Sequence, residues 1–142
     1  DLKAMVAQYP NQLCFDSTFN ELLAHAIEAG ADFFAMPSRY EPCGLNQMIS
    51  MRYGTIPIVR KTGGLANTVF DFELDEQRGN GIVFEEFSAE ALEDALARAL
   101  LLYEEKEQLE AIRRVGMAGD YSWTPRAQEY LMLYDDIVQR IR

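Results

Sequence analysis

Short apolar runs alternate with stretches of helical periodicity along most of the chain. The runs at 32–36, 56–59 and 81–84 are continuous and apolar, which is typical of parallel strands that are buried on both faces. Another short run, at 12–16, follows turn residues and predicts one more strand. Because strands and helices alternate, we predict an α/β fold in which helices cover both faces of a parallel sheet.

Residues that commonly begin helices stand before the periodic segments. Thr18 and Glu21 form a capping box, and Ser88 is placed to cap another helix. Thr124 followed by Pro125 is typical of the start of a helix. The helices predicted in this way are 2–8, 18–30, 44–53, 65–70, 88–103, a segment that ends near 115, and 124–141.

Three of these helices carry an apolar stripe that we expect to face the core. The stripes are Phe19, Leu22, Leu23, Ala26 and Ile27 in the first, Leu92, Ala95, Leu96, Ala99 and Leu100 in the second, and Tyr130, Leu131, Tyr134, Ile137, Val138 and Ile141 in the third. The sequence opens within a helical pattern that has no cap, so we expect the chain to begin inside a larger protein.

Composition and charge indicate a globular protein and disfavour some kinds of partner. The 142 residues fit a single domain, and 49% hydrophobic with 25% charged residues is ordinary for a globular one. The net charge of −10 argues against nucleic acid or an anionic membrane as a partner. No apolar stretch approaches the roughly 20 residues that span a bilayer. We therefore expect a soluble protein.

The two cysteines, Cys14 and Cys43, lie far apart and have no metal-ligand spacing. The N-terminus lacks the charged and apolar segments of a signal peptide. We expect reduced thiols in a cytoplasm-like compartment, with no metal site.

The loops that follow the predicted strands are the expected place for chemistry, because ligands of open parallel sheets collect at the carboxyl ends of the strands. In the loop after 32–36, Pro42 restricts Glu41 to extended geometry and so holds its carboxylate in place. Gly44 lets a ligand approach the backbone closely. The amides of Gly44, Leu45 and Asn46 then open a helix and can face a phosphate. This loop is a candidate anion and polar-ligand site.

Each candidate residue also has a purely structural interpretation. Glu41 is equally consistent with a solvated loop carboxylate, and Cys43 with a small packing residue. Phe19 is either a core anchor of its helix or an aromatic face on which a base stacks. The loop Thr62-Gly63-Gly64 is by itself no more than a tight turn. Three cations beside these loops suit a diphosphate or are simply solvated: Arg39, Arg60 and Lys61.

Two long segments, Pro37 to Leu45 and Met51 to Leu65, together with Thr68-Val69, look like the signature of bacterial glycogen synthases and plant starch synthases. The resemblance continues at 30–32, 81–84 and 121–123 and in the terminal helix, so it covers essentially the whole chain. It implies the Rossmann-like C-terminal half of a GT-B glycosyltransferase, with 1–142 forming part of the domain that binds the donor nucleotide.

The activity that the resemblance implies is transfer of glucose from ADP-glucose to the non-reducing end of an α-1,4-glucan, with retention and release of ADP. The implied setting is the bacterial cytoplasm or, in a plant, the plastid stroma. No cofactor or metal is implied. A UDP-sugar glycosyltransferase and a non-catalytic binding module derived from such an enzyme stay open as alternatives.

The resemblance also implies a role for each candidate residue. Glu41 would lie against the transferred glucose, with Cys43 and Gly44 on the same sugar. Leu45 and Asn46 would meet the diphosphate. Phe19 would stack on adenine, and Thr62, Gly63 and Gly64 would lie near the donor.

Several departures from the family pattern limit these implications. Phe19 stands where some relatives have tyrosine, and Ile49 stands where the wider superfamily has a second glutamate. The family places a basic pair, which neutralises the leaving diphosphate, and an acceptor-side domain before the position of Asp1. We therefore expect this chain to hold half of a donor site and to be inactive alone, with the glucan bound through the N-terminal domain.

Overall fold

A three-stranded parallel sheet forms the centre of the protein. The computed structural model describes residues 2–74 and 78–141. The strands are β1 (Phe33–Met36), β2 (Ile56–Arg60) and β3 (Ile82–Phe84), in the order β1-β2-β3. Both pairs are parallel, with Ala35 opposite Ile58 and Ile58 opposite Ile82. The predicted α/β class with a parallel sheet is confirmed.

The predicted strand at 12–16 is absent from the sheet. This segment follows the turn that ends α1 (Leu2–Gln8), and all five of its residues are exposed and lie outside helices and strands. A strand is stable only when a neighbour pairs with its backbone groups. Within the part of the chain that the structure describes, 12–16 has no such neighbour. The prediction was therefore wrong.

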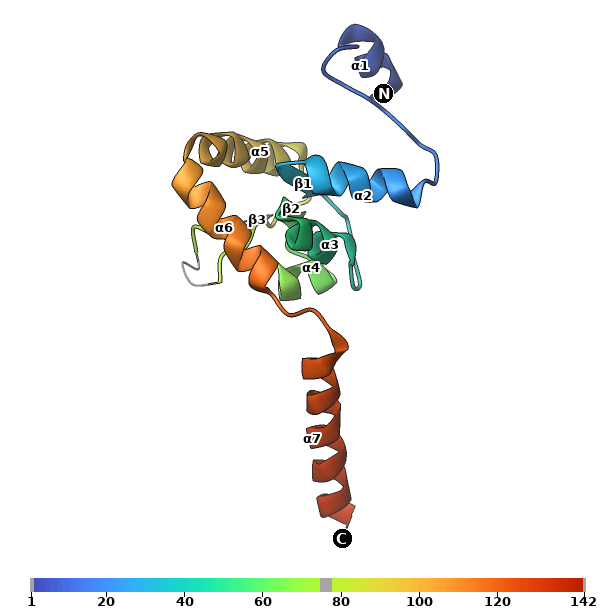
Figure 1. Ribbon diagram of the computed structural model, residues 1–142, viewed down its shortest axis with the longest axis vertical. Helices are drawn as coiled ribbons and strands as arrows, with labels where there is room; N and C mark the ends of the chain where they lie inside the picture. The colour runs from blue at the N-terminus through green and yellow to red at the C-terminus, as the bar shows by residue number, and fades with distance from the viewer. Residues whose placement is uncertain (1, 75–77, 142) are drawn as a thin grey trace.

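Among the described residues, six further helices follow α1; five of them lie around the sheet, and the last extends away from it (Figure 1). They are α2 (Glu21–Gly30), α3 (Asn46–Tyr53), α4 (Gly63–Thr68), α5 (Ala89–Glu104), α6 (Lys106–Ala118) and α7 (Trp123–Ile141). The predicted cap Ser88 is confirmed, because its side chain accepts the amide of Ala91. Two other caps differ: Asn20, not Thr18, caps α2 by accepting the amide of Leu23, and α7 begins at Trp123, before Thr124.

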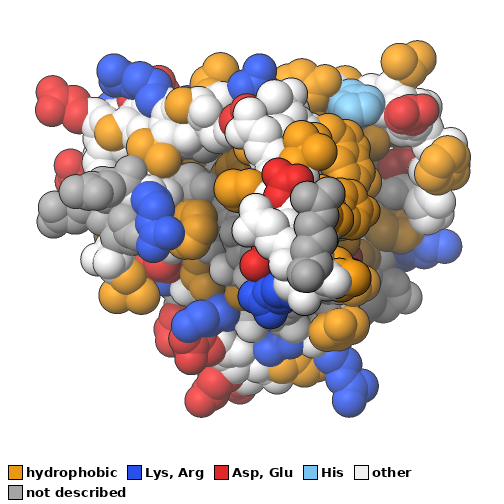
Figure 2. All heavy atoms as spheres, turned by 90° about the horizontal axis from the view of Figure 1, so that it is seen from below, with side chains coloured by type: hydrophobic (Ala, Val, Ile, Leu, Met, Phe, Trp, Pro, Cys, Tyr) orange, Lys and Arg blue, Asp and Glu red, His pale blue; other side chains and the backbone are white. Residues whose placement is uncertain are grey.

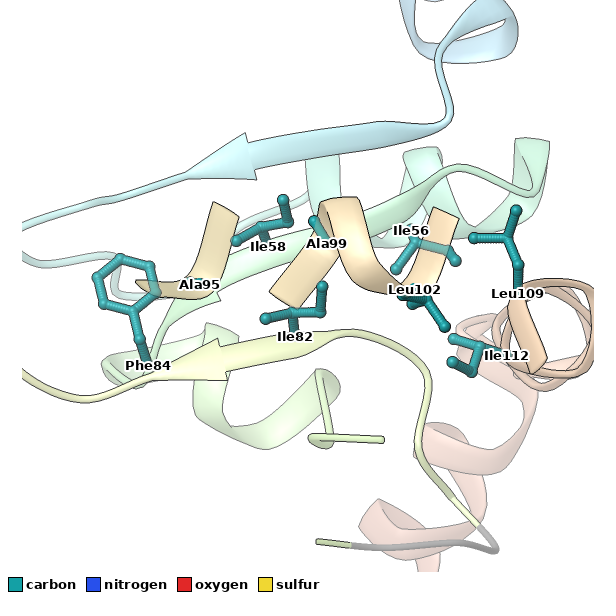
Figure 3. Close-up of a cluster of buried hydrophobic side chains, with 9 residues drawn as sticks. All are labelled: Ile56, Ile58, Ile82, Phe84, Ala95, Ala99, Leu102, Leu109 and Ile112. Carbon is teal, nitrogen blue, oxygen red and sulfur yellow. The ribbon is translucent and has the colours of Figure 1, made fainter. Parts of the chain in front are cut away.

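Alternation along β2 divides the core between the two faces of the sheet. Ile56 and Ile58 point to the face that α5 and α6 cover, and Val59 points to the face that α3 and α4 cover. Side chains of a strand alternate in this way. The first cluster, drawn in Figure 3, consists of Ile56, Ile58, Ile82, Phe84, Ala95, Ala99, Leu102, Leu109 and Ile112. The second consists of Met51, Val59, Leu65 and Val69.

The predicted apolar stripes are mostly exposed. In α5 the inward residues are Ala95, Ala99 and Leu102, whereas Leu96 and Leu100 face solvent, because the helix is rotated relative to the predicted face. In α2 the buried residue is Glu28, whereas Leu22 and Ile27 are exposed, as is Phe19, which precedes the helix. The helix itself is present, but the prediction that this stripe of α2 faces the core was wrong.

The apolar stripe of α7 has no packing partner in the described part of the chain. This helix has no buried residue, and it projects away from the sheet on the opposite side from α1 (Figure 1). Figure 2 shows hydrophobic side chains gathered at the centre of the face seen from below. The exposed stripe residues are Tyr130, Leu131, Tyr134, Ile137, Val138 and Ile141. Among the described residues, no helix is both long and apolar enough to cross a membrane.

Candidate functional site

Two of the predicted loops touch through their backbones at the carboxyl edge of the sheet. The amide of Gly64 donates a hydrogen bond to the carbonyl oxygen of Glu41, at 3.0 Å. A Cβ added to Gly63 would lie 2.0 Å from that same oxygen, and a Cβ added to Gly64 would lie 1.9 Å from the carbonyl oxygen of Cys43. Both positions therefore require glycine, and the Thr62-Gly63-Gly64 loop is more than a tight turn.

The loop continues through a left-handed turn into the start of α3. Gly44 has a φ of +72°, a conformation that favours glycine. Leu45, the N-cap residue of α3, makes no side-chain capping hydrogen bond. Met48 and Ile49 donate the first helical hydrogen bonds, both to the oxygen of Leu45. The amides of residues 44–46 precede these donors, so the start of α3 can receive an anion.

Most side chains of this loop are available to a ligand. Cys43, Leu45 and Asn46 are exposed, and Glu41 is half-buried. The exposure of Cys43 excludes the packing interpretation. The contact of Glu41 with Gly64 uses its backbone oxygen.

Two of the three cations beside the loops, Arg60 and Lys61, make contacts within the protein. Arg60 donates to the carbonyl oxygens of Ser38, Arg39 and Glu85, at 2.9 Å to Ser38 and 3.2 Å to Glu85. It therefore ties the loops after β1 and β3 together. Lys61 pairs with the Glu85 carboxylate at 2.7 Å, and its hydrogen bond lowers the pKa of that carboxyl. Arg60 therefore has a structural role beside the two interpretations that the sequence left open.

A hollow of about 400 Å³ brings Phe19 and Asn46 together between α2 and the start of α3. Phe19 is fully exposed there, so it is not a core anchor. Ala24 and Ile49 contribute apolar lining, and His25 and Glu28 contribute polar lining. The hollow thus offers an aromatic face next to the amides that open α3.

Glu28 is a buried carboxyl in this hollow that the sequence alone did not indicate. Burial raises the pKa of Glu28, an effect that the charge of His25 opposes. The two side chains are 3.9 Å apart. Tyr53 lies beside them, with its hydroxyl 3.4 Å from Nδ1 of His25.

The predicted residues therefore form two adjoining groups. Glu41, Cys43, Gly63 and Gly64 meet through their backbones, and Phe19 meets Asn46 across the hollow. Gly44 and Leu45 connect the two groups along the chain. Across residues 2–74 and 78–141, no three His, Cys, Asp or Glu side chains are grouped so that they could hold a metal ion.

Several curated proteins are similar to this chain over nearly its whole length. A glycogen synthase of Marinobacter nauticus is 51% identical over 138 residues, which cover 96% of this chain and 28% of that protein. A glycogen synthase of Myxococcus xanthus is 53% identical over 137 residues, which cover 96% of this chain and 28% of that protein. The chain thus spans a little over a quarter of the length of these relatives.

Solved structures show the same architecture. The catalytic domain of starch synthase IV from Arabidopsis thaliana, bound to ADP and acarbose, superposes with a TM-score of 0.83 at 38% identity and covers 96% of this chain and 29% of its own. Sucrose-phosphate synthase from Thermosynechococcus elongatus has a TM-score of 0.68 at 22% identity, and the match covers 98% of this chain and 34% of that one. At this identity the likeness shows a shared fold and nothing further. Together these neighbours confirm the GT-B fold class.

The family itself follows from a match that covers more than half of the chain. Residues 4–114, which include both loops of the candidate site and the hollow beside α3, match the glycosyl transferases group 1 family. The predicted resemblance to glycogen and starch synthases is confirmed by the relatives above. The chain belongs to the glycosyl transferases group 1 family.

Proposed function

We propose that this chain forms the donor-nucleotide half of a retaining glycogen or starch synthase. In the proposed reaction, glucose moves from ADP-glucose to the non-reducing end of an α-1,4-glucan, and ADP leaves. The observation that carries the proposal is the contact of the Glu41 loop with Gly63 and Gly64, beside the start of α3 and the hollow that Phe19 lines. Relatives of about 50% identity that are named glycogen synthase support it.

The transfer builds positive charge at the anomeric carbon and negative charge on the departing ADP, so catalysis requires stabilisation of both. Glu41 lies against the glucose in this proposal, and Cys43 and Gly44 contact the same sugar. The amides at the start of α3, with the Asn46 side chain, receive the diphosphate. Phe19 stacks on adenine. Thr62, Gly63 and Gly64 border the donor from the side of α4.

Residues 1–142 would then be part of a larger donor domain. The glucan would bind to an N-terminal domain, and a basic pair outside this sequence would neutralise the leaving diphosphate. The chain alone would therefore be inactive. The cytoplasm of a bacterium or the plastid stroma of a plant is the proposed location.

A donor panel tests this function. The complete protein that carries this sequence is assayed for transfer of labelled glucose to glycogen from ADP-glucose and from UDP-glucose, in parallel with the chain of residues 1–142. We expect the complete protein to prefer ADP-glucose and the chain alone to show no turnover. A preference for UDP-glucose would identify another sugar-nucleotide transferase. Nucleotide binding without transfer would indicate a binding module, and turnover by the chain alone would refute the half-site proposal.

A further inference from the structure

Gln47 connects the two loops of the candidate site through its side-chain amide. It is the second residue of α3 and is fully buried. Its Nε2 donates to the carbonyl oxygen of Gly44 and to Oγ1 of Thr68, each at 3.0 Å, and lies 3.5 Å from the carbonyl oxygen of Cys43. Thr68 in turn donates to the carbonyl oxygen of Gly64, at 2.9 Å. One path of hydrogen bonds therefore runs from the Gly44 turn to α4.

The other end of the same side chain has no hydrogen-bond partner in the described structure. Oε1 of Gln47 is buried and receives no donor. A buried polar atom without a partner costs stability, and an apolar side chain of similar length would avoid that cost. Packing alone therefore does not account for a glutamine here. What the glutamine adds is the Nε2 group that holds the loop.

Gln47 and Gly44 also fit each other sterically. A Cβ added to Gly44 would lie 2.6 Å from Oε1 of Gln47, so the side chain occupies the space beside the turn. The left-handed conformation of Gly44 directs the chain into α3. The direction of the amides at 44–46 therefore depends on how this turn is held.

We propose that Gln47 is a positioning residue for the diphosphate of the donor. Its Nε2 fixes the Gly44 turn against α4, and this aims the amides that open α3 at the phosphate oxygens. The inference rests on the proposed function, because it assigns a residue to the phosphate side of that site. Gln47 itself touches no reacting atom in this role.

The test uses Gln47→Met in the complete protein, since methionine keeps the length of the side chain and removes both polar atoms. We expect the dissociation constant for ADP to rise by about 10-fold to 10²-fold, the loss expected when about one hydrogen bond to a charged phosphate is no longer held in place. The kcat/KM for ADP-glucose should fall in proportion. The KM for the glucan should not change, and Tm should stay within about 4 °C of wild type.

Matched variants separate positioning from general damage. Gln108→Met makes the same change on the exposed face of α6 and should leave ADP affinity unaltered. Thr68→Val removes one acceptor of Nε2 and should weaken ADP binding less than Gln47→Met does. Thr68→Ser keeps the hydroxyl and should bind ADP as wild type does. If Gln47→Met does not fold, the ADP affinities of Thr68→Val and Thr68→Ser test the proposal instead.

ADP affinity within twofold of wild type in Gln47→Met, or in Thr68→Val where Gln47→Met does not fold, would overturn the positioning role. An equal rise of the glucan KM would also overturn it, because it would indicate general damage. Failure of the wild-type protein to bind ADP would instead contradict the proposed function itself.

Discussion

The backbone and the side chain of Glu41 have separate roles. Its carbonyl oxygen accepts the amide of Gly64, and in the proposed function its carboxylate faces the glucose. Substitutions that keep the backbone in place therefore alter the chemistry of the site with little effect on the fold.

We expect Glu41→Gln in the complete protein to lower kcat by about 10²-fold or more, the size expected when a group that stabilises transition-state charge is removed. Thermal stability should be unchanged, because the Gly64 hydrogen bond uses only the backbone. Glu86→Gln, at an exposed carboxylate after β3, is the control and should keep full activity. An unchanged rate in Glu41→Gln would show that Glu41 is a solvated loop carboxylate.

Phe19 is available for stacking because its ring is fully exposed beside the start of α3. We expect Phe19→Leu to weaken ADP binding by about 1–3 kcal/mol, the value of one base stacked on an aromatic ring. Phe19→Tyr keeps the ring and should bind as wild type does. Isothermal titration with ADP measures both. Equal affinity of the leucine and wild-type proteins would assign the base to another part of the surface.

At the scale of elements, the contact between the Glu41 loop and α4 depends on two glycines. Gly64→Ala places a methyl group against the carbonyl of Cys43, so the backbones must separate. We expect a loss of about 1–3 kcal/mol in the free energy of unfolding, as for other overpacked sites, together with weaker ADP binding. Gly30→Ala is the matched control, since its added Cβ meets no atom within 4 Å. Urea denaturation of both variants gives the comparison, and equal stabilities would contradict the tight contact.

The helices and strands that the sequence predicted correctly are those whose signals are local. The apolar runs of β1, β2 and β3 and the cap at Ser88 depend on neighbouring residues, and all are present. The errors arose where a distant partner decides. In the described part of the chain, the segment 12–16 has no strand to pair with, and the predicted stripe of α2 is exposed. The choice of Asn20 over Thr18 as the cap is a local one that helical periodicity alone does not decide.

The candidate site was predictable in its residues and not in its contacts. Periodicity and turn chemistry located Glu41, Gly44 and the glycine pair, but a backbone contact between residues 41 and 64 leaves no trace in a local pattern. Gln47 was missed for a related reason. A glutamine near the start of a helix usually faces solvent, and only the fold brings Thr68 to it.

At the scale of the whole molecule, the exposed apolar stripes of α2 and α7 contrast with the buried core around the sheet. Contiguous apolar faces of this kind mark surfaces that pack against another protein or another part of the same protein. They agree with the proposal that residues 1–142 are part of a larger domain.

The stability of the whole chain should depend on the protonation of Glu28. Burial raises the pKa of Glu28 above its ordinary value of 4.5, with His25 acting in the opposite direction. The folded protein therefore keeps this proton to higher pH than the unfolded chain does. The contribution of the neutral carboxyl is complete below pH 4.5 and is lost as pH rises through the higher pKa of the folded state.

Glu28→Gln removes this dependence, because glutamine does not titrate. Thermal denaturation from pH 4.5 to neutral should therefore show wild type losing stability relative to the variant as pH rises. The opposite trend would mean that His25 stabilises a charged Glu28 more than burial penalises it. Glu21, which lines the same hollow, provides the control: Glu21→Gln is at an exposed position and should follow wild type.

The contact between the Glu41 loop and the glycine pair has a consequence for how such a site can diverge. Glu41 and Cys43 contribute only carbonyl oxygens to it, and every amino acid has one. The demand for a particular residue type falls entirely on Gly63 and Gly64. If the proposed function holds, descendants of this protein can exchange the side chains that face the sugar, and acquire a new donor preference, while they inherit the same backbone contact.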